Sequence, residues 1–240
     1  MLKINSFSKT YAGGVKAVDD LTLHVEPGDI YAFIGHNGAG KTTTLKACAG
    51  ILDFNEGEIL IDGVSVREDP VACKKKIAYI PDNPDIYEHL TGVQYLNFIS
   101  DIFRIPPVQR NERITKYAEL FEIKGNLGDV ISSYSHGMKQ KLAIISALIH
   151  DPKLWLLDEP FVGLDPKATH LLKGIMAERC AEGCAVFFST HVLEVAEKLC
   201  NKVAIIKHGR LMASGTMEEV KGSASLDEMF MEVTENDHEA

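Results

Sequence analysis

One short loop constrains this chain more than any other feature of its sequence. Residues 35–42 read GHNGAGKT and match the pattern G-x-x-x-x-G-K-[ST]. A continuous apolar run at 30–34 precedes the loop, which is typical of a buried parallel strand, and a helix is expected from Lys41 to about Ala49. A strand, a glycine-rich loop and a helix in this order predict a phosphate-binding turn inside an α/β domain.

The residue types of this loop suit an anionic ligand. Glycines let the backbone wrap closely around phosphates, and the free N–H groups at the start of the helix bind anions. Lys41 would place a positive charge on the β- and γ-phosphates of a nucleotide, and Thr42 would offer its hydroxyl to Mg²⁺. The expected nucleotide-binding residues are Gly35, Asn37, Gly38, Ala39, Gly40, Lys41, Thr42 and Thr43.

An acidic element suited to a metal ion and a water molecule follows later in the chain. The apolar run at 154–157 ends in Asp158 and Glu159. A strand of a parallel sheet delivers such carboxylates to the carboxyl edge of the sheet, beside the phosphate-binding loop. We therefore expect Asp158 to hold Mg²⁺ through water and Glu159 to act as the general base that polarises the attacking water.

Composition limits the partners of the chain. The 240 residues carry 34 acidic and 25 basic side chains, a formal net charge of −9, which disfavours a nucleic-acid-binding role. No apolar run approaches the roughly 18–20 residues that span a bilayer, and the first residues lack a secretory signal pattern, so we expect a cytoplasmic protein. The five cysteines lack a disulfide spacing, and reduced thiols are favoured over a metal site at Cys180 and Cys184.

Strand and helix patterns alternate along the chain. Short strands are expected at 2–7, 17–25 and 58–61, buried strands at 30–34, 154–157, 185–188 and 203–206, and helices within 88–150 and near 167–181. This alternation predicts an α/β domain with a mainly parallel sheet, into which the helical block is inserted. The acidic stretch from Ser225 is interpreted as a solvated end that starts with a short helix, rather than as a dedicated binding element.

Further motifs follow the phosphate-binding loop in a fixed order. Residues 80–84 read IPDNP, 134–140 read YSHGMKQ, 163–166 read GLDP and 189–191 read STH. Together with the loop and the acidic pair, and over about residues 2–220, these motifs resemble the ATP-hydrolysing subunit of an ATP-binding-cassette (ABC) transporter. The loop alone would allow many enzymes, whereas the signature-like segment ahead of the acidic pair narrows the resemblance to ABC ATPases.

The resemblance implies both a fold and a division of the chain. It implies an α/β fold with a P-loop NTPase core and mainly parallel sheet, an N-terminal antiparallel β subdomain and an inserted helical subdomain at about 85–150. The ABC ATPase domain would cover 1–220, and 221–240 would form an acidic C-terminal tail.

The resemblance also implies a mechanism that needs two chains. In the family two ATPase domains pack head to tail, so the partner would be a second copy or a homologous ATPase subunit. Each ATP then faces the signature of the other chain, which here comprises Ser135, His136, Gly137 and Met138, at the start of a helix near Met138. Asp165 lies in the segment that resembles the loop crossing the dimer interface.

Three further residues take roles from the resemblance. His191 would touch the γ-phosphate and position the water. Tyr11 would stack on adenine, with an exposed turn tyrosine as the alternative. Asp82 stands where the family usually has a glutamine, and two roles stay open for it, a ligand on the metal side or a cap of the turn before Asn83.

Departures from the family pattern suggest a branch of it. The signature has His136 and Met138 where glycine and glutamine are usual, while Ser135 and Gly137 remain. This form, the segment 80–84 and the tail segment 225–230 look most like the bacterial exporter branch, which includes antibiotic and peptide exporters.

We therefore expect an ATPase subunit, with ATP and Mg²⁺, that powers translocation through an integral membrane permease on a separate chain. Export is the expected direction, and the expected place is the inner face of the cell membrane, as a peripheral protein. The helical stretch 87–103 is the expected docking surface, with Tyr87, Tyr95 and Phe98 as either core or interface residues. The alternative is a non-transport ABC ATPase that acts as a regulatory or resistance module.

Overall fold

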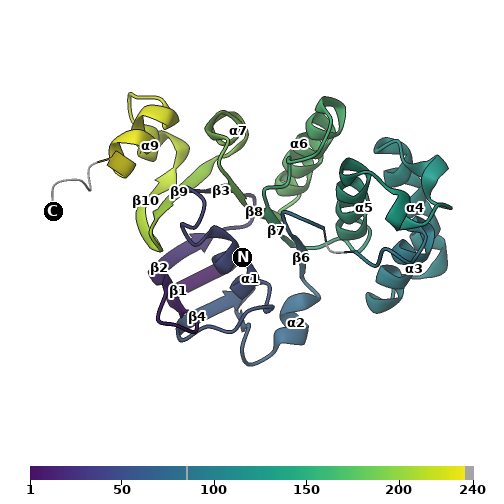
Figure 1. Cartoon of the computed structure of the whole chain (residues 1–240), viewed down its shortest axis with the longest axis horizontal. Helices are drawn as coiled ribbons and strands as arrows, with labels where there is room; N and C mark the ends of the chain where they lie inside the picture. The colour runs from purple at the N-terminus through teal and green to yellow at the C-terminus, as the bar shows by residue number, and fades with distance from the viewer. Residues whose placement is uncertain (85, 236–240) are drawn as a thin grey trace.

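A six-stranded sheet forms the centre of the computed structural model, which describes residues 1–84 and 86–235 (Figure 1). The strand order within these residues is β10-β9-β3-β8-β7-β6, and β10 runs antiparallel to β9 while the other neighbours are parallel. The strands are β3 (Ile30–Ile34), β6 (Ile77–Ile80), β7 (Leu154–Asp158), β8 (Ala185–Thr190), β9 (Lys202–Lys207) and β10 (Arg210–Thr216). The predicted α/β fold with a mainly parallel sheet is confirmed.

Both faces of the sheet are buried along β3, β7 and β8, which is why these strands are mostly continuous apolar runs. Alternate residues of each strand enter different cores. Along β3, Ala32 and Ile34 lie in a core that we call the helical core. This core also contains Leu142 of helix α5 (His136–Leu148) and Leu172 of helix α6 (Pro166–Ala181). On the opposite face, Phe33 lies in a core shared with the N-terminal strands and α1, which we call the sheet core.

An antiparallel sheet built by the N-terminal residues covers the second face, as predicted (Figure 1). Its order is β2-β1-β4-β5, and Leu2 of β1 pairs with Val25 on one side and Ile61 on the other. The elements of this part are β1 (Leu2–Thr10), β2 (Lys16–Val25), β4 (Glu56–Ile61), β5 (Val64–Ser65), α1 (Lys41–Cys48) and α2 (Pro70–Lys74). Helix α1 contributes the buried Leu45 to the sheet core and so fixes the phosphate-binding loop against both sheets.

The expected helical block projects from the sheet between β6 and β7. It contains α3 (Gly92–Ile102), α4 (Pro107–Leu120), two 3₁₀ turns (Lys124–Asn126 and Ile131–Ser133) and α5 (His136–Leu148). Helix α5 begins two residues before the predicted Met138, because Ser135 caps it: the Ser135 hydroxyl accepts a hydrogen bond of 3.3 Å from the Met138 N–H. The signature segment therefore includes the first helical turn.

The acidic tail folds as a helix against the molecule. The last elements are α6 (Pro166–Ala181), α7 (Leu193–Leu199), α8 (Met217–Lys221) and α9 (Leu226–Glu235). Leu226 and Phe230 of α9 are buried in the helical core, so the expectation of a solvated end is wrong for this face of the helix. In Figure 1, α9 lies at the end of the molecule opposite α3 and α4. Residues 236–240, with two of the predicted tail acids, lie outside the described residues.

All five cysteines are free and buried. Within the described residues, no group of three or more histidine, cysteine or acidic side chains could hold a metal ion. The described part of the chain likewise contains no helix with the length and hydropathy needed to cross a bilayer.

Candidate nucleotide site

The phosphate-binding loop is packed so closely that two of its glycines cannot be replaced. A Cβ atom on Gly35 would lie 2.4 Å from the carbonyl oxygen of Ile206, and one on Gly40 would lie 2.6 Å from that of Ala17. Gly40 also has φ 109, a conformation that residues other than glycine rarely adopt. Ala39 is buried between them, and its N–H donates to the carbonyl of His36 at 3.1 Å. Packing against β2 and β9 therefore gives the loop one fixed shape.

Lys41 is the first residue of α1 and is almost fully buried under this loop. Its ammonium donates to the carbonyl oxygens of Gly35 at 2.6 Å and His36 at 3.2 Å. Burial lowers the pKa of Lys41, and the nearby carboxylates of Glu159 and Asp158 oppose this effect. The lysine charge is thus held inside the curve of the loop, where a phosphate group would need it.

Asp158 is the last residue of β7 and Glu159 follows it, so the strand ends in the two acidic residues, as expected. Asp158 is 1% exposed, and its Oδ1 accepts a hydrogen bond of 2.5 Å from the Ser189 hydroxyl. Its Oδ2 is also buried but finds no hydrogen-bond donor among the described residues. A buried carboxylate oxygen without a donor fits the water shell of a magnesium ion, since this ion favours carboxylates and keeps several waters. The residues present therefore fit Mg²⁺.

Glu159 has an unusual backbone and a side chain that is paired. Its φ is 49, in the left-handed region that few non-glycine residues occupy. Its carboxylate Oε1 lies 2.9 Å from Nδ1 of His191, which follows β8. The His191 side chain is largely exposed, whereas the Glu159 side chain is 13% exposed. The carboxylate of Glu159 is therefore the inner member of the pair.

A cleft of about 310 Å³ joins these groups. It brings together nine of the predicted residues and one that was not predicted, Ala17 of β2. The lining consists of Ala17, Asn37, Gly38, Gly40, Lys41, Thr42, Thr43, Asp82, Asp158 and Glu159. A hollow with one buried cation, two hydroxyls and three carboxylates can hold a phosphate chain together with a divalent ion.

Tyr11 lies outside that lining but is connected to it. Its hydroxyl is 3.2 Å from the Thr43 hydroxyl, and Lys9 places its ammonium 5.3 Å from the centre of the tyrosine ring. Its side chain is 41% exposed, which leaves the ring available for stacking. Both interpretations of Tyr11 therefore remain compatible with its position.

The signature residues and Asp165 lie elsewhere. Ser135 and His136 are exposed at the start of α5, and Gly137 packs so closely that a Cβ would lie 2.7 Å from the carbonyl of Gly163. Asp165 caps α6, accepting from the Ala168 N–H at 2.8 Å. It also pairs with Lys141 of α5 at 2.6 Å, which lowers the pKa of Asp165. This ion pair ties the second turn of α5 to the N-cap of α6. Met138 is partly buried against the helical core.

Sequence reasoning missed two residues that have buried hydroxyl groups near the acidic pair. Ser189 bridges the acidic pair, and the Tyr79 hydroxyl is buried without a partner among the described residues. Burial raises the pKa of Tyr79, and the charges of Asp158 and Asp82 add to this effect. A signal for Ser189 was present, because it is a polar residue at the carboxyl end of an apolar strand that neighbours the strand of Asp158.

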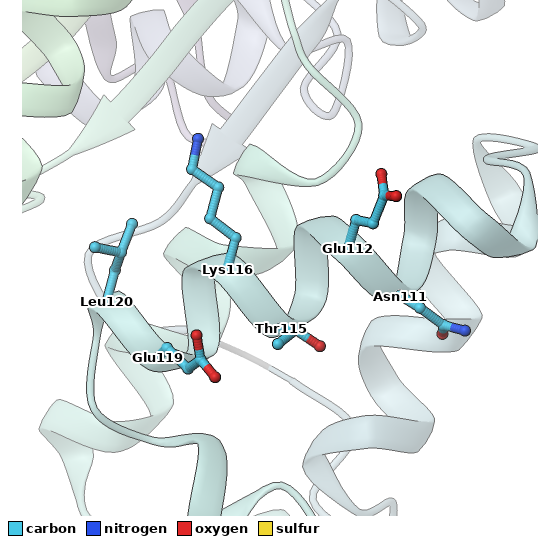
Figure 2. A pocket seen from close by; sticks show the side chains of 6 residues that line it. All are labelled: Asn111, Glu112, Thr115, Lys116, Glu119 and Leu120. Atoms are coloured by element: carbon cyan, nitrogen blue, oxygen red, sulfur yellow. The ribbon is translucent and has the colours of Figure 1, made fainter.

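A hollow larger than this cleft lies elsewhere on the molecule. It measures about 770 Å³ and is lined by residues of α4, whose side chains point in different directions from the helix (Figure 2). Those residues are Asn111, Glu112, Thr115, Lys116, Glu119 and Leu120. An open surface of mixed charge on one helix lacks the converging groups of a binding site, and we assign no function to it.

Comparisons with known proteins agree with this geometry. The family model described as "ABC transporter" matches residues 18–162. The ABC-type transporter ATP-binding protein EcsA of Bacillus subtilis is 34% identical, over 91% of this chain and 90% of its own length. A solved ATP-binding subunit of an ABC transporter superposes with a TM-score of 0.93 at 34% identity, covering 98% of this chain and 99% of that one. The fold is also that of the ATP-binding cassette MJ0796, solved as a dimer bound to ADP and phosphate, with a TM-score of 0.80, 24% identity and coverage of 90% and 99%.

Proposed function

The chain belongs to the ABC transporter family of ATP-binding proteins, and from this premise we propose that two such chains sandwich ATP and power export through a separate membrane permease. ATP hydrolysis, with ATP and Mg²⁺ bound, is the activity of this family. The proposal concerns what lies beyond it: the role of each residue, the pairing of chains and the membrane partner.

The composition of the cleft supports pairing. Among the described residues that line it, none comes from 135–138, although these residues resemble a signature that contacts ATP. They are presented instead at the N-terminus of α5, with Ser135 exposed. A second chain in head-to-tail orientation would bring its own Ser135 and Gly137 to the γ-phosphate, where helix N–H groups bind anions. The proposal of paired chains rests on this observation: the phosphate-binding cleft and the signature residues 135–138 lie apart on one chain.

The proposed chemistry follows from the charges in the cleft. Lys41 and the loop N–H groups bind the β- and γ-phosphates, while Thr42, Asp158 and Asp82 hold the metal ion and its waters. Mg²⁺, when bound, neutralises phosphate charge that builds up during transfer. Glu159 takes the proton of the attacking water as general base, and His191 holds its carboxylate in place.

An apolar surface on the helical subdomain supports docking to a permease. Tyr87 is 54% exposed and packs edge-to-face on Phe98, which is 41% exposed. Ile102 is exposed as well, so this surface has aromatic and aliphatic side chains of the kind that anchor protein interfaces. Tyr95, by contrast, is buried in the helical core and cannot be a contact. The permease would place the ATPase at the inner face of the cell membrane.

Two measurements test the function. The purified chain should hydrolyse ATP in the presence of Mg²⁺, and Lys41→Ala should abolish both nucleotide binding and hydrolysis. The tagged chain should co-purify with an integral membrane protein from detergent-solubilised membranes, and the double variant Tyr87→Ala, Phe98→Ala should lose that partner while it keeps its ATPase activity. Hydrolysis without any membrane partner would instead favour the alternative, a non-transport ABC ATPase.

A further inference from the structure

The hydroxyl of Ser189 lies between the two acidic residues of the site. Ser189 is the fully buried penultimate residue of β8 and stands opposite Asp158 in the parallel register of β7 and β8. Its Oγ is 2.5 Å from Asp158 Oδ1 and accepts a hydrogen bond of 3.0 Å from the Glu159 N–H. The Glu159 N–H can only donate and an ionised Asp158 can only accept, so the single hydroxyl proton must point to Asp158.

This arrangement gives the two carboxylate oxygens of Asp158 different roles. The hydrogen bond from Ser189 occupies Oδ1 and fixes the rotation of the carboxylate. Oδ2 is then held buried without a donor among the described residues, on a residue that lines the same cleft as Lys41 and Thr42. Without Ser189 the carboxylate could turn, and neither oxygen would be reserved for the hydrated metal ion.

The same hydroxyl also acts on the general base. Glu159 is the first residue after β7 and adopts the left-handed conformation, with φ 49. Its N–H is shared between the Ser189 hydroxyl at 3.0 Å and the Ser189 carbonyl at 3.3 Å. These bonds hold the backbone in a conformation that it would otherwise tend to leave, and so aim the side chain at His191.

We propose that Ser189 is the positioning residue of the ATPase site, which reserves Asp158 Oδ2 for the metal ion and holds Glu159 in its catalytic conformation. This inference rests on the proposed function, because it assigns Asp158 to the metal and Glu159 to the water. Ser189 touches neither the nucleotide nor the metal; it acts through its two neighbours.

The test compares Ser189→Ala with a matched control. Ser100→Ala removes an equally buried serine hydroxyl, which donates to the Leu96 carbonyl on α3, away from the acids. Binding of Mn²⁺ is measured by electron paramagnetic resonance in the presence of a non-hydrolysable ATP analogue. Ser189→Ala should weaken Mn²⁺ binding by about tenfold and lower kcat by roughly 10- to 100-fold, the usual effect of losing a hydrogen-bond partner of a metal ligand. Affinity for the analogue without metal should stay unchanged, and Ser100→Ala should alter none of these values.

Two more variants separate positioning from folding. Ser189→Thr keeps the hydroxyl on a residue suited to a strand and should restore Mn²⁺ binding to near the parent value. Ser189→Cys keeps the volume but donates weakly, so its Mn²⁺ affinity should be reduced; it carries the test if Ser189→Ala does not fold. Parent-like Mn²⁺ binding and kcat in Ser189→Ala, or in Ser189→Cys if Ser189→Ala does not fold, would overturn the inference, while co-purification of the parent ATPase with a membrane protein would still uphold the proposed function. A parent chain that does not hydrolyse ATP would instead remove the proposed function itself.

Discussion

At the scale of single residues, the site depends on groups that are buried and fixed before any ligand arrives. Lys41 is held by two loop carbonyls, and Asp158 is oriented by a hydroxyl from the next strand. Fixed charges of this kind contribute more to catalysis than mobile ones, because they need not reorganise during the reaction. Asp82 and His191, by contrast, are exposed.

The role of Glu159 can be tested by an isosteric change. Glu159→Gln keeps the shape of the side chain and its contact with His191 but cannot take a proton from water. Hydrolysis should fall by roughly 10²-fold or more, while ATP binding persists. The ATP-bound pair of chains should then accumulate and appear in size-exclusion chromatography with ATP. Hydrolysis near the parent rate would mean that another group is the base.

Asp82 is expected to act on the metal side, because its carboxylate lines the cleft with Lys41 and Asp158. Asp82→Asn removes the charge, so the Mg²⁺ concentration for half-maximal hydrolysis should rise, since Mg²⁺ favours carboxylate ligands. Asp82→Gln, which restores the side chain that the family usually has, should recover much of the activity. The measurement is the ATPase rate across a magnesium titration, and three superimposable curves would make Asp82 a turn residue.

At the scale of elements, helix α5 has functional groups at both ends. Its first turn presents Ser135 and the signature, and the residues that follow its last turn include His150. His150 stacks on Phe103 with ring centres 3.8 Å apart, and its Nε2 lies 3.0 Å from the carbonyl of Ile77 in β6. One helix therefore links the expected dimer surface to the central sheet.

The N-terminal end of α5 predicts how chains assemble. Ser135→Arg places a long charged side chain where the γ-phosphate of the partner's ATP would lie. Dimerisation with ATP, measured in the Glu159→Gln background by light scattering, should be lost. Binding of ATP to the single chain should remain, because Ser135 does not line the chain's own cleft. A dimer that forms equally well would contradict the head-to-tail arrangement.

His150, which follows the C-terminal end of α5, predicts that the stability of the protein depends on pH. Burial lowers the pKa of His150 below its ordinary 6.5, against the opposing effect of the carbonyls of Ile77 and Ser146. On acidification the unfolded chain takes up a proton at this residue before the folded chain does, so stability should fall as the pH drops through 6.5. Urea unfolding of the parent between pH 7.5 and 5.5 should show this loss, and His150→Gln should show a smaller one. Equal losses in the two proteins would assign the effect to other groups.

How far the sequence predicts these elements depends on what determines them. Four of the six central strands, β3, β7, β8 and β9, follow from continuous apolar runs, and the phosphate-binding loop follows from its own motif, so these parts are predicted closely. Strand β6 was not predicted. The start of α5 is missed by two residues because capping by Ser135, and not periodicity, sets it. The sequence left open whether Tyr95 is core or interface, and the bridge made by Ser189 was missed, because both depend on neighbours that are distant in the sequence. For the candidate site, motifs predict which residues converge, but not how each is held.

At the scale of the whole molecule, the two cores on opposite faces of the central sheet meet at the phosphate-binding loop. The loop is packed against β2 and β9 on the sheet side. On the other side, the ring of Phe230 in α9 lies 5.0 Å from the ring of His36 in the loop. The C-terminal helix is thereby in contact with the nucleotide site, although its residues lie far away in the sequence.

This contact predicts that the tail steadies the loop. Phe230→Ala removes a buried aromatic ring and should lower the free energy of unfolding by about 3 kcal/mol, as large-to-small core changes do. Hydrogen exchange at residues 35–40 should become faster under native conditions. Glu232→Ala, at an exposed position of the same helix, is the control and should change neither. Unaltered exchange in Phe230→Ala would show that α9 stabilises the fold without affecting the loop.

The buried thiols make it possible to measure how fast each hydrophobic core opens. Cys48 and Cys73 lie in the sheet core, whereas Cys180 and Cys200 lie in the helical core. Burial raises the pKa of these thiols, that of Cys180 to about 12, so a thiol reagent reacts with each one only when the surrounding core opens. Labelling rates at the four positions, read by mass spectrometry, therefore time the opening of each core separately, and they show whether the two faces of the sheet come apart together or in turn.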